Sequence, residues 1–113
     1  MTPADRLRAE LDEVRAAVQR LTRDLAEVVA ASEGSNADDE HDPEGATIGF
    51  ERAQLTSLLQ AARRREREVQ SALAALAAGG YGTCASCGGP IGAERLAARP
   101  SAGTCVRCAS AAR

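Results

Sequence analysis

The chain contains almost no aromatic residues: one Phe, one Tyr and no Trp among 113 residues. With only Phe50 and Tyr81 it cannot bury a large apolar core, so we expect its stability to come from helix packing along a narrow seam and from a bound metal. Lysine is also absent, and all fourteen basic side chains are arginines. The formal net charge is −2, which argues against a strong attraction of the whole protein to nucleic acids.

Long apolar runs are missing as well. No basic segment followed by an apolar run opens the chain, and no stretch reaches the roughly 18 apolar residues that a membrane span requires. We therefore expect neither a signal peptide nor a membrane-spanning helix, and a cytoplasmic location.

Four cysteines stand near the C-terminus as two C-x-x-C pairs separated by seventeen residues: Cys84, Cys87, Cys105 and Cys108. This spacing predicts one structural Zn²⁺ held by all four sulfurs, and glycines around the first pair suit a tight knuckle. Four protein ligands leave no open position for an activated water, so we expect the metal to hold the fold and the protein not to be an enzyme. Two disulfides or a pair of redox thiols are the alternatives.

The N-terminal part of the chain has the pattern of one long amphipathic helix. Apolar residues recur in steps of three and four: Leu7, Leu11, Val14, Val18, Leu21, Leu25 and Val28. Thr2 and Asp5 can form a capping box, Pro3 suits the first helical position, and Gly34 suits the position after the last turn. The predicted helix covers residues 3–33.

A second apolar stripe follows residue 50 and ends before two glycines: Leu55, Leu59, Ala62, Val69, Leu73 and Leu76. Pairs such as Leu11 with Leu73 and Leu25 with Leu59 have residue numbers that add up to 83 or 84, as expected for two helices that fold back on each other. The predicted fold is mainly α: an antiparallel coiled-coil hairpin over residues 1–79 and a small four-cysteine finger over residues 80–113.

Between the two stripes, residues 34–47 are predicted to form an acidic tip loop. Five carboxylates fall within seven residues: Asp38, Asp39, Glu40, Asp42 and Glu44. They could form a soluble polar loop, in which Asp42 and Pro43 open the second helix, or a weak Mg²⁺ or Mn²⁺ site. The third interpretation is an acidic tip that a stiff hairpin delivers to a basic or metal-containing partner.

Residues 80–108 carry a more specific pattern. The stretch Tyr81-Gly82-Thr83-Cys84-Ala85-Ser86-Cys87-Gly88 is followed by Ile91, Arg95, Leu96, Pro100, Ala102 and the second cysteine pair. This pattern resembles the C4 zinc finger of the DksA/TraR family of bacterial transcription regulators, and the preceding hairpin agrees with that family's architecture. The resemblance implies a cytoplasmic regulator that binds RNA polymerase, not promoter DNA, and inserts its hairpin tip through the secondary channel.

The family's tip pattern, D-x-x-D-x-A, can be placed on this chain in one frame. Asp39 and Asp42 keep both aspartates, and Glu44 replaces the alanine. The resemblance therefore implies that Asp39 and Asp42 contact the polymerase active centre, whereas the alanine position does not carry over. We expect Glu44, which stands at that position, to belong to the same tip site. No site for the alarmone ppGpp, with which some members act, is transferred, because the chain has no lysine for the basic contacts.

The alternative function is that of a zinc-stabilised helical hairpin acting as a protein–protein interaction module unrelated to the channel. We expect a monomer, or a dimer formed by exchange of hairpins. Sequence-specific DNA binding is not expected, since no helix of the finger presents a basic face for reading bases.

Overall fold

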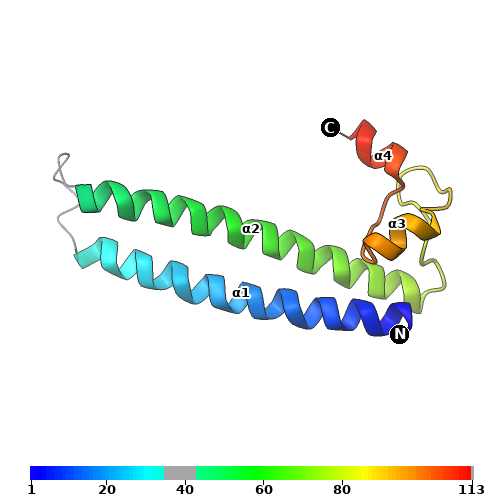
Figure 1. Ribbon diagram of the computed structural model, residues 1–113, viewed down its shortest axis with the longest axis horizontal. Coiled ribbons are helices and arrows are strands. Elements are labelled where there is room, and N and C mark those ends of the chain that lie inside the picture. Colours follow the sequence, from blue (N-terminus) through cyan, green and yellow to red (C-terminus); the bar gives the residue numbers. More distant parts are fainter. Residues whose placement is uncertain (35–42, 113) are drawn as a thin grey trace. The chain divides into compact units, whose positions relative to one another are not determined.

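The computed structural model describes residues 1–34 and 43–112. In these ranges the chain forms four helices and no strand: α1 (Pro3–Gly34), α2 (Pro43–Ala77), α3 (Ala93–Ala98) and α4 (Val106–Ala111). Figure 1 shows that α1 and α2 are by far the longest elements and run antiparallel. A single isolated β-bridge joins Thr83 and Pro90 in the described part of the chain. The predicted mainly helical fold, with two long helices and a four-cysteine C-terminus, is confirmed.

The start of α1 is fixed by a reciprocal cap. The Asp5 N–H donates to Thr2 Oγ1 and the Thr2 N–H donates to Asp5 Oδ2, both at 3.1 Å. These bonds satisfy backbone donors that have no partner inside the helix. The helix begins at Pro3, as predicted, and ends at Gly34, one residue beyond the prediction.

Helix α2 begins before the end of the predicted tip loop. The helix begins at Pro43, so residues 43–47, which we assigned to the tip loop, belong to α2. Proline fits a first helical position because its fixed φ is helical and its missing N–H would have no partner there. The alternative interpretation, in which Pro43 opens the second helix, is the correct one at this residue.

The end of α2 is a glycine cap. Gly79 adopts a φ of +81°, a conformation that costs glycine little. Its N–H donates to the carbonyl of Leu76 at 3.3 Å, and the Gly80 N–H donates to that of Ala75 at 2.8 Å. This pair of bonds is the Schellman arrangement, so the chain leaves the helix at a defined point.

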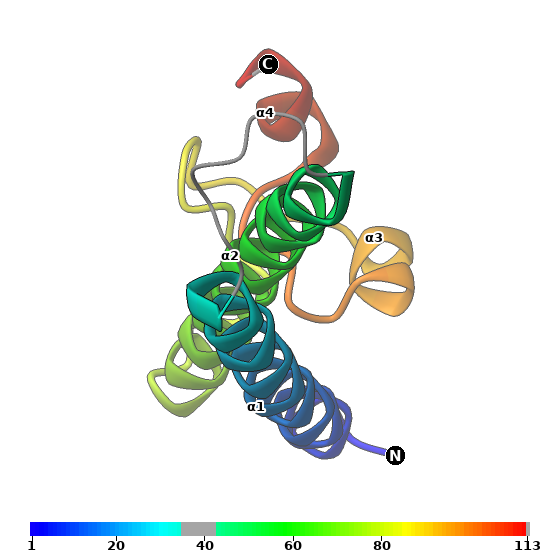
Figure 2. The same ribbon diagram turned by 90° about the vertical axis from the view of Figure 1, so that its left-hand side faces the viewer.

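The described residues divide into two compact units. The finger-bearing unit comprises residues 1–13 and 65–113. The other unit comprises residues 14–64 and is called the loop-bearing unit after the predicted tip loop. Both long helices run through both units. Figure 2 views the end of α1 and the beginning of α2, which belong to the loop-bearing unit.

The apolar stripes supply the buried side chains of the two long helices. Leu7, Leu11, Val69 and Ala72 are buried in the finger-bearing unit, and Val14 and Leu59 in the loop-bearing unit. All of them except Ala72 belong to the predicted stripes. Each buried Leu or Val side chain contributes about 1.5–3 kcal/mol relative to an exposed one, so the seam is the main source of helix stability.

The predicted register of the hairpin is wrong in the finger-bearing unit. Glu10 of α1 and Arg65 of α2 form an ion pair with an Oε1 to Nε distance of 3.1 Å, and their residue numbers add up to 75, not to 83 or 84. The predicted register would place Glu10 about eight residues, or about 12 Å, away from Arg65 along α2, too far for the two side chains to meet. Because apolar residues recur every three or four positions on both helices, a shifted register also pairs apolar faces, and the pattern alone does not determine which one forms.

No helix in the described ranges is both long enough and apolar enough to cross a membrane.

Candidate metal centre

The first cysteine pair lies on a tight knuckle closed by backbone hydrogen bonds. The Cys84 N–H donates to the Gly89 carbonyl at 2.8 Å, and the Gly88 N–H donates back to the Cys84 carbonyl at 2.9 Å. Gly88 has a φ of +75°, which lets the chain reverse between the pair and Pro90. The Gly89 N–H also donates to Cys87 Sγ at 3.4 Å.

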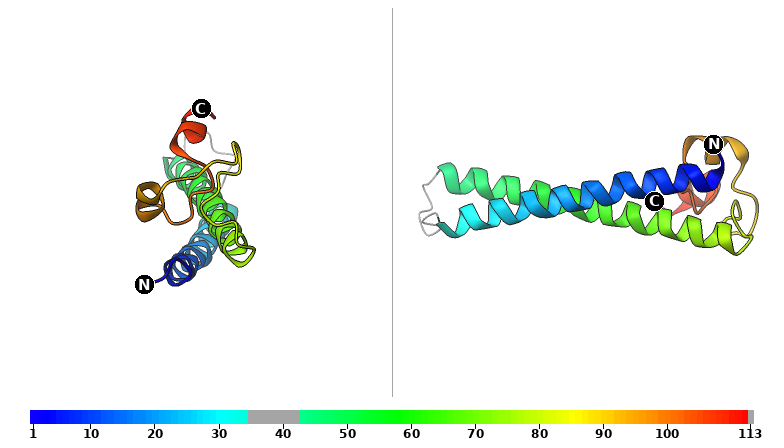
Figure 3. Two further views of the ribbon diagram at one scale, coloured as in Figure 1. Left: turned by 90° about the vertical axis from the view of Figure 1, so that its right-hand side faces the viewer. Right: turned by 90° about the horizontal axis from the view of Figure 1, so that it is seen from below.

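The second cysteine pair is presented by the start of a short helix. Cys105 is the residue before α4, and Cys108 lies one turn into it. The Cys105 N–H donates to Cys84 Sγ at 3.4 Å, so the backbone of one pair contacts a sulfur of the other. In the left view of Figure 3, α3 (orange) and α4 (red) lie apart from each other within the finger.

All four sulfurs lie within 4.8 Å of one another, and Cys87 Sγ is 3.9 Å from Cys105 Sγ. Ligands at the usual Zn–S distance of about 2.3 Å in a tetrahedron are separated by about 3.8 Å, so this cluster has the size of a tetrahedral zinc site. Cys84 is buried with Ile91 and Ala102, and Leu96, Cys105 and Cys108 pack against this small core. The donor set is therefore that of one structural Zn²⁺ ligated by Cys84, Cys87, Cys105 and Cys108, as predicted.

The hydrogen bonds around the sulfurs shift the cysteine pKa values in opposite directions. Donation from the Cys105 N–H is the main reason that the pKa of Cys84 falls to about 6. The pKa of Cys105 is also lowered, chiefly by the Cys108 N–H. Hydrogen bonding to the Cys105 thiol and to the other two sulfurs raises the pKa of Cys108 to about 12. Sulfurs this close cannot all remain thiolates without a cation, and zinc supplies the charge that keeps them ionised.

Comparison with known families agrees with this geometry. Residues 79–112 match the model of the prokaryotic dksA/traR C4-type zinc finger. The family resemblance inferred from the cysteine spacing and the residues between the pairs is thereby confirmed for this part of the chain.

The fold of the chain agrees with that of a solved structure, transcription factor DksA2 from Pseudomonas aeruginosa. The match has a TM-score of 0.74 at 24% sequence identity and covers 97% of this chain and 79% of that one. At this identity the match establishes a common fold. Comparison with curated proteins found no significant match.

The predicted tip residues lie outside the part of the chain whose side chains the structure describes. Asp39 and Asp42 fall between the two described ranges, and Glu44 falls in the first turn of α2. Their contact with a polymerase active centre remains a prediction.

The contacts between the side chains of α1 and α2 and the four-cysteine finger were not predicted from the sequence. Arg6 and Glu10 of α1 bond to residues 97 and 101, and Glu68 of α2 bonds to Arg99. Arg65 of α2 pairs with Glu10 of α1. No local sequence pattern predicts a contact between residues that are 91 positions apart. The only signal was that Arg6 and Glu10 are one helical turn apart beside the apolar stripe.

Proposed function

We propose that this protein is a transcription regulator that binds RNA polymerase and inserts the tip of its helical hairpin into the polymerase secondary channel. The observation that carries the proposal is a dksA/traR zinc finger joined to a two-helix hairpin in the fold of a transcription factor. The zinc in this proposal is structural, because four cysteine ligands complete its coordination.

In this proposal the acidic tip is the part of the chain that contacts the polymerase active centre. Asp39, Asp42 and Glu44 belong to a cluster of five carboxylates within seven residues. Carboxylates are suitable partners for Mg²⁺ and for basic side chains, both of which occur where nucleotides are polymerised. With 32 and 35 residues, α1 and α2 are about 48 and 53 Å long, enough to carry such a loop into a deep channel.

The first test separates binding from activity. We expect the protein to co-purify with core RNA polymerase and to change transcription from a sensitive promoter. Asp42→Asn should weaken the transcriptional effect and leave polymerase binding nearly unchanged, because it removes one charge at the tip. Asp12→Asn, an exposed aspartate of α1, is the matched control and should change neither. Equal loss of binding and activity in Asp42→Asn would make this aspartate an anchor or a helix cap.

A second candidate function, a protein–protein interaction module, is favoured by exposed apolar side chains on α2. Phe50 is 71% exposed and Leu58 is 48% exposed, both in the loop-bearing unit. Aromatic residues such as phenylalanine are enriched in the central part of protein contact sites. For this function we expect no polymerase binding, and self-association in sedimentation experiments that Phe50→Ser weakens.

A further inference from the structure

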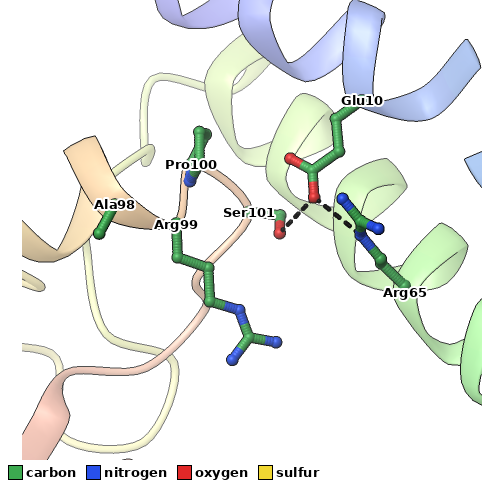
Figure 4. A pocket seen from close by; sticks show the side chains of 6 residues that line it. All are labelled: Glu10, Arg65, Ala98, Arg99, Pro100 and Ser101. Carbon is green, nitrogen blue, oxygen red and sulfur yellow. Dashed lines mark hydrogen bonds and ion pairs between the residues drawn. The ribbon is translucent and has the colours of Figure 1, made fainter. Parts of the chain in front are cut away.

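Residues 97–101, here called the anchoring segment, are fastened to α1 by two side chains on one face of that helix. Arg6 Nη2 donates to the Ala97 carbonyl at 2.6 Å. Ala97 is in the last turn of α3, where carbonyls have no partner within the helix, so Arg6 satisfies one of them. One turn further along α1, Glu10 Oε1 accepts from Ser101 Oγ at 3.4 Å, and Figure 4 shows this carboxylate between Ser101 and Arg65.

Two further bonds hold the middle of the anchoring segment. Arg99 Nη2 pairs with Glu68 Oε2 of α2 at 2.8 Å. Tyr81 Oη donates to the Pro100 carbonyl at 2.8 Å. The segment is therefore bonded at four of its five residues, from α1, from α2 and from the linker before the first cysteine pair.

Burial supports a fixed position for this segment. Ser101 is only 3% exposed, and it is a buried polar residue whose hydroxyl has Glu10 as a partner. The Glu10 side chain is itself 14% exposed and is balanced by Arg65. Two polar groups at this level of burial lose much of their stabilisation when a partner is removed.

The anchoring segment leads directly into the zinc site. Ala102, the next residue, is buried against Cys84 and Ile91. The Gly103 carbonyl accepts from the Ala85 N–H at 2.9 Å, between the two cysteines of the first pair. Two residues later the chain reaches Cys105, so a displacement of the segment would move a zinc ligand.

We propose that Arg6 and Glu10 are positioning residues for zinc, although they lie at the opposite end of the chain from the cysteines. They hold the anchoring segment against α1 and thereby keep Cys105 and Cys108 in the metal-binding arrangement. Coupling between two sites is reciprocal: if bound zinc orders the segment, the contacts that order the segment tighten zinc binding by the same factor. The proposal concerns the metal site alone and does not depend on polymerase binding.

The test compares two double variants with unchanged net charge. Arg6→Ala with Glu10→Ala removes both α1 contacts, since alanine has no polar side-chain atom. Arg8→Ala with Glu13→Ala removes the same two charge types from exposed positions of α1. In competition with a colorimetric zinc chelator, we expect the first variant to bind zinc about fivefold more weakly or worse. The control should stay within about twofold of the parent. Equal zinc affinity of both variants, with an unchanged helical circular dichroism signal, would overturn the proposal.

A second measurement decides the question if the first variant loses helix. In the unsubstituted protein, removal of zinc by a chelator should increase amide hydrogen exchange in the anchoring segment and also in residues 3–13 of α1. The end of α1, residues 25–33, is the internal reference and should exchange equally in both states. If residues 3–13 also exchange equally with and without zinc, zinc binding does not stabilise the start of α1 and the proposal is wrong.

Discussion

The zinc finger and the helical hairpin are stabilised by different interactions. The finger has two six-residue helices, one isolated bridge and a buried core of only Cys84, Ile91 and Ala102. The hairpin has two helices of 32 and 35 residues, whose buried positions are Leu, Val and Ala. A metal thus replaces the apolar core that the finger is too small to build, whereas the hairpin depends on its seam.

This comparison predicts that loss of zinc acts mainly on residues 80–113 and on the start of α1 that contacts the anchoring segment, whereas loss of seam packing acts on the two long helices. The following experiments test it in order of decreasing expected effect.

Removal of one zinc ligand should have the largest effect. Cys87→Ser leaves three thiolates, so we expect loss of stoichiometric zinc and loosening of residues 80–113, since structural zinc contributes most of the folding free energy of such fingers. Most of the helical circular dichroism signal should remain, because it arises from α1 and α2. Metal analysis and hydrogen exchange measure the two effects. Ser86→Ala, on the same knuckle, should keep the zinc. Unchanged hydrogen exchange of residues 80–113 in Cys87→Ser would contradict a structural role for the metal.

Acidification should release the same metal reversibly. The folded, metal-free chain favours the Cys84 thiolate, whose pKa is lowered from 9.0 to about 6. This stabilisation is complete above the ordinary thiol pKa and is lost as the pH falls through about 6, and bound zinc shifts the loss to lower pH. We therefore expect zinc to stay bound at pH 7 and to be released only below about pH 6.

The raised pKa of Cys108 gives this experiment a second observable. At about 12, the Cys108 thiol is protonated at pH 7 in the metal-free protein, so zinc binding must release its proton. Calorimetry in two buffers of different ionisation enthalpy measures this release. Zinc binding without proton release at pH 7 would show that the four sulfurs are not all ligands.

Shortening a buried side chain in the seam should have the next largest effect, and it should destabilise the two long helices. Leu7 is completely buried, so Leu7→Ala should lower the free energy of unfolding by about 2–5 kcal/mol through lost burial and a residual cavity. Thermal unfolding followed by circular dichroism measures the loss. Leu58→Ala, at a position 48% exposed on α2, is the control and should cost much less. Similar losses for both would mean that the seam is not packed as described.

Loss of the α1 cap should be the smallest effect. Thr2→Ala removes the hydroxyl that accepts from the Asp5 N–H and should destabilise the first turn by about 1 kcal/mol at most. Thr2→Ser keeps the acceptor and should behave like the parent. Faster hydrogen exchange in the first turn of Thr2→Ala is the expected readout, and equal exchange in all three proteins would show that the cap does not hold the helix end.

Features determined by local chemistry could be predicted from the sequence. The bounds of α1 follow from a capping box and a terminal glycine, and the zinc ligands follow from the spacing of two cysteine pairs. In both cases the residues that decide the structure are neighbours in the chain. The predicted end of the loop at residue 47 was wrong because Pro43 starts α2, although proline is a signal for a first helical position.

Features determined by contacts between distant segments could not be predicted in the same way. The predicted register was wrong because two repetitive apolar stripes match in more than one alignment, and the Glu10–Arg65 ion pair shows that a different one forms. The anchoring of residues 97–101 depends on Arg6 and Glu10, whose charges look like ordinary solvent-facing residues in the sequence. Only the three-dimensional structure, in which the finger and the start of α1 belong to one compact unit, identifies such contacts.

The most direct test of the proposed function uses the polymerase as a local source of radicals. Fe²⁺ substituted for the active-site Mg²⁺ of RNA polymerase generates hydroxyl radicals that cleave only polypeptide close to that metal. With this protein bound, we predict cleavage between residues 36 and 46, around Asp39, Asp42 and Glu44. Binding without cleavage there, or cleavage confined to the zinc finger, would contradict insertion of the hairpin tip into the channel.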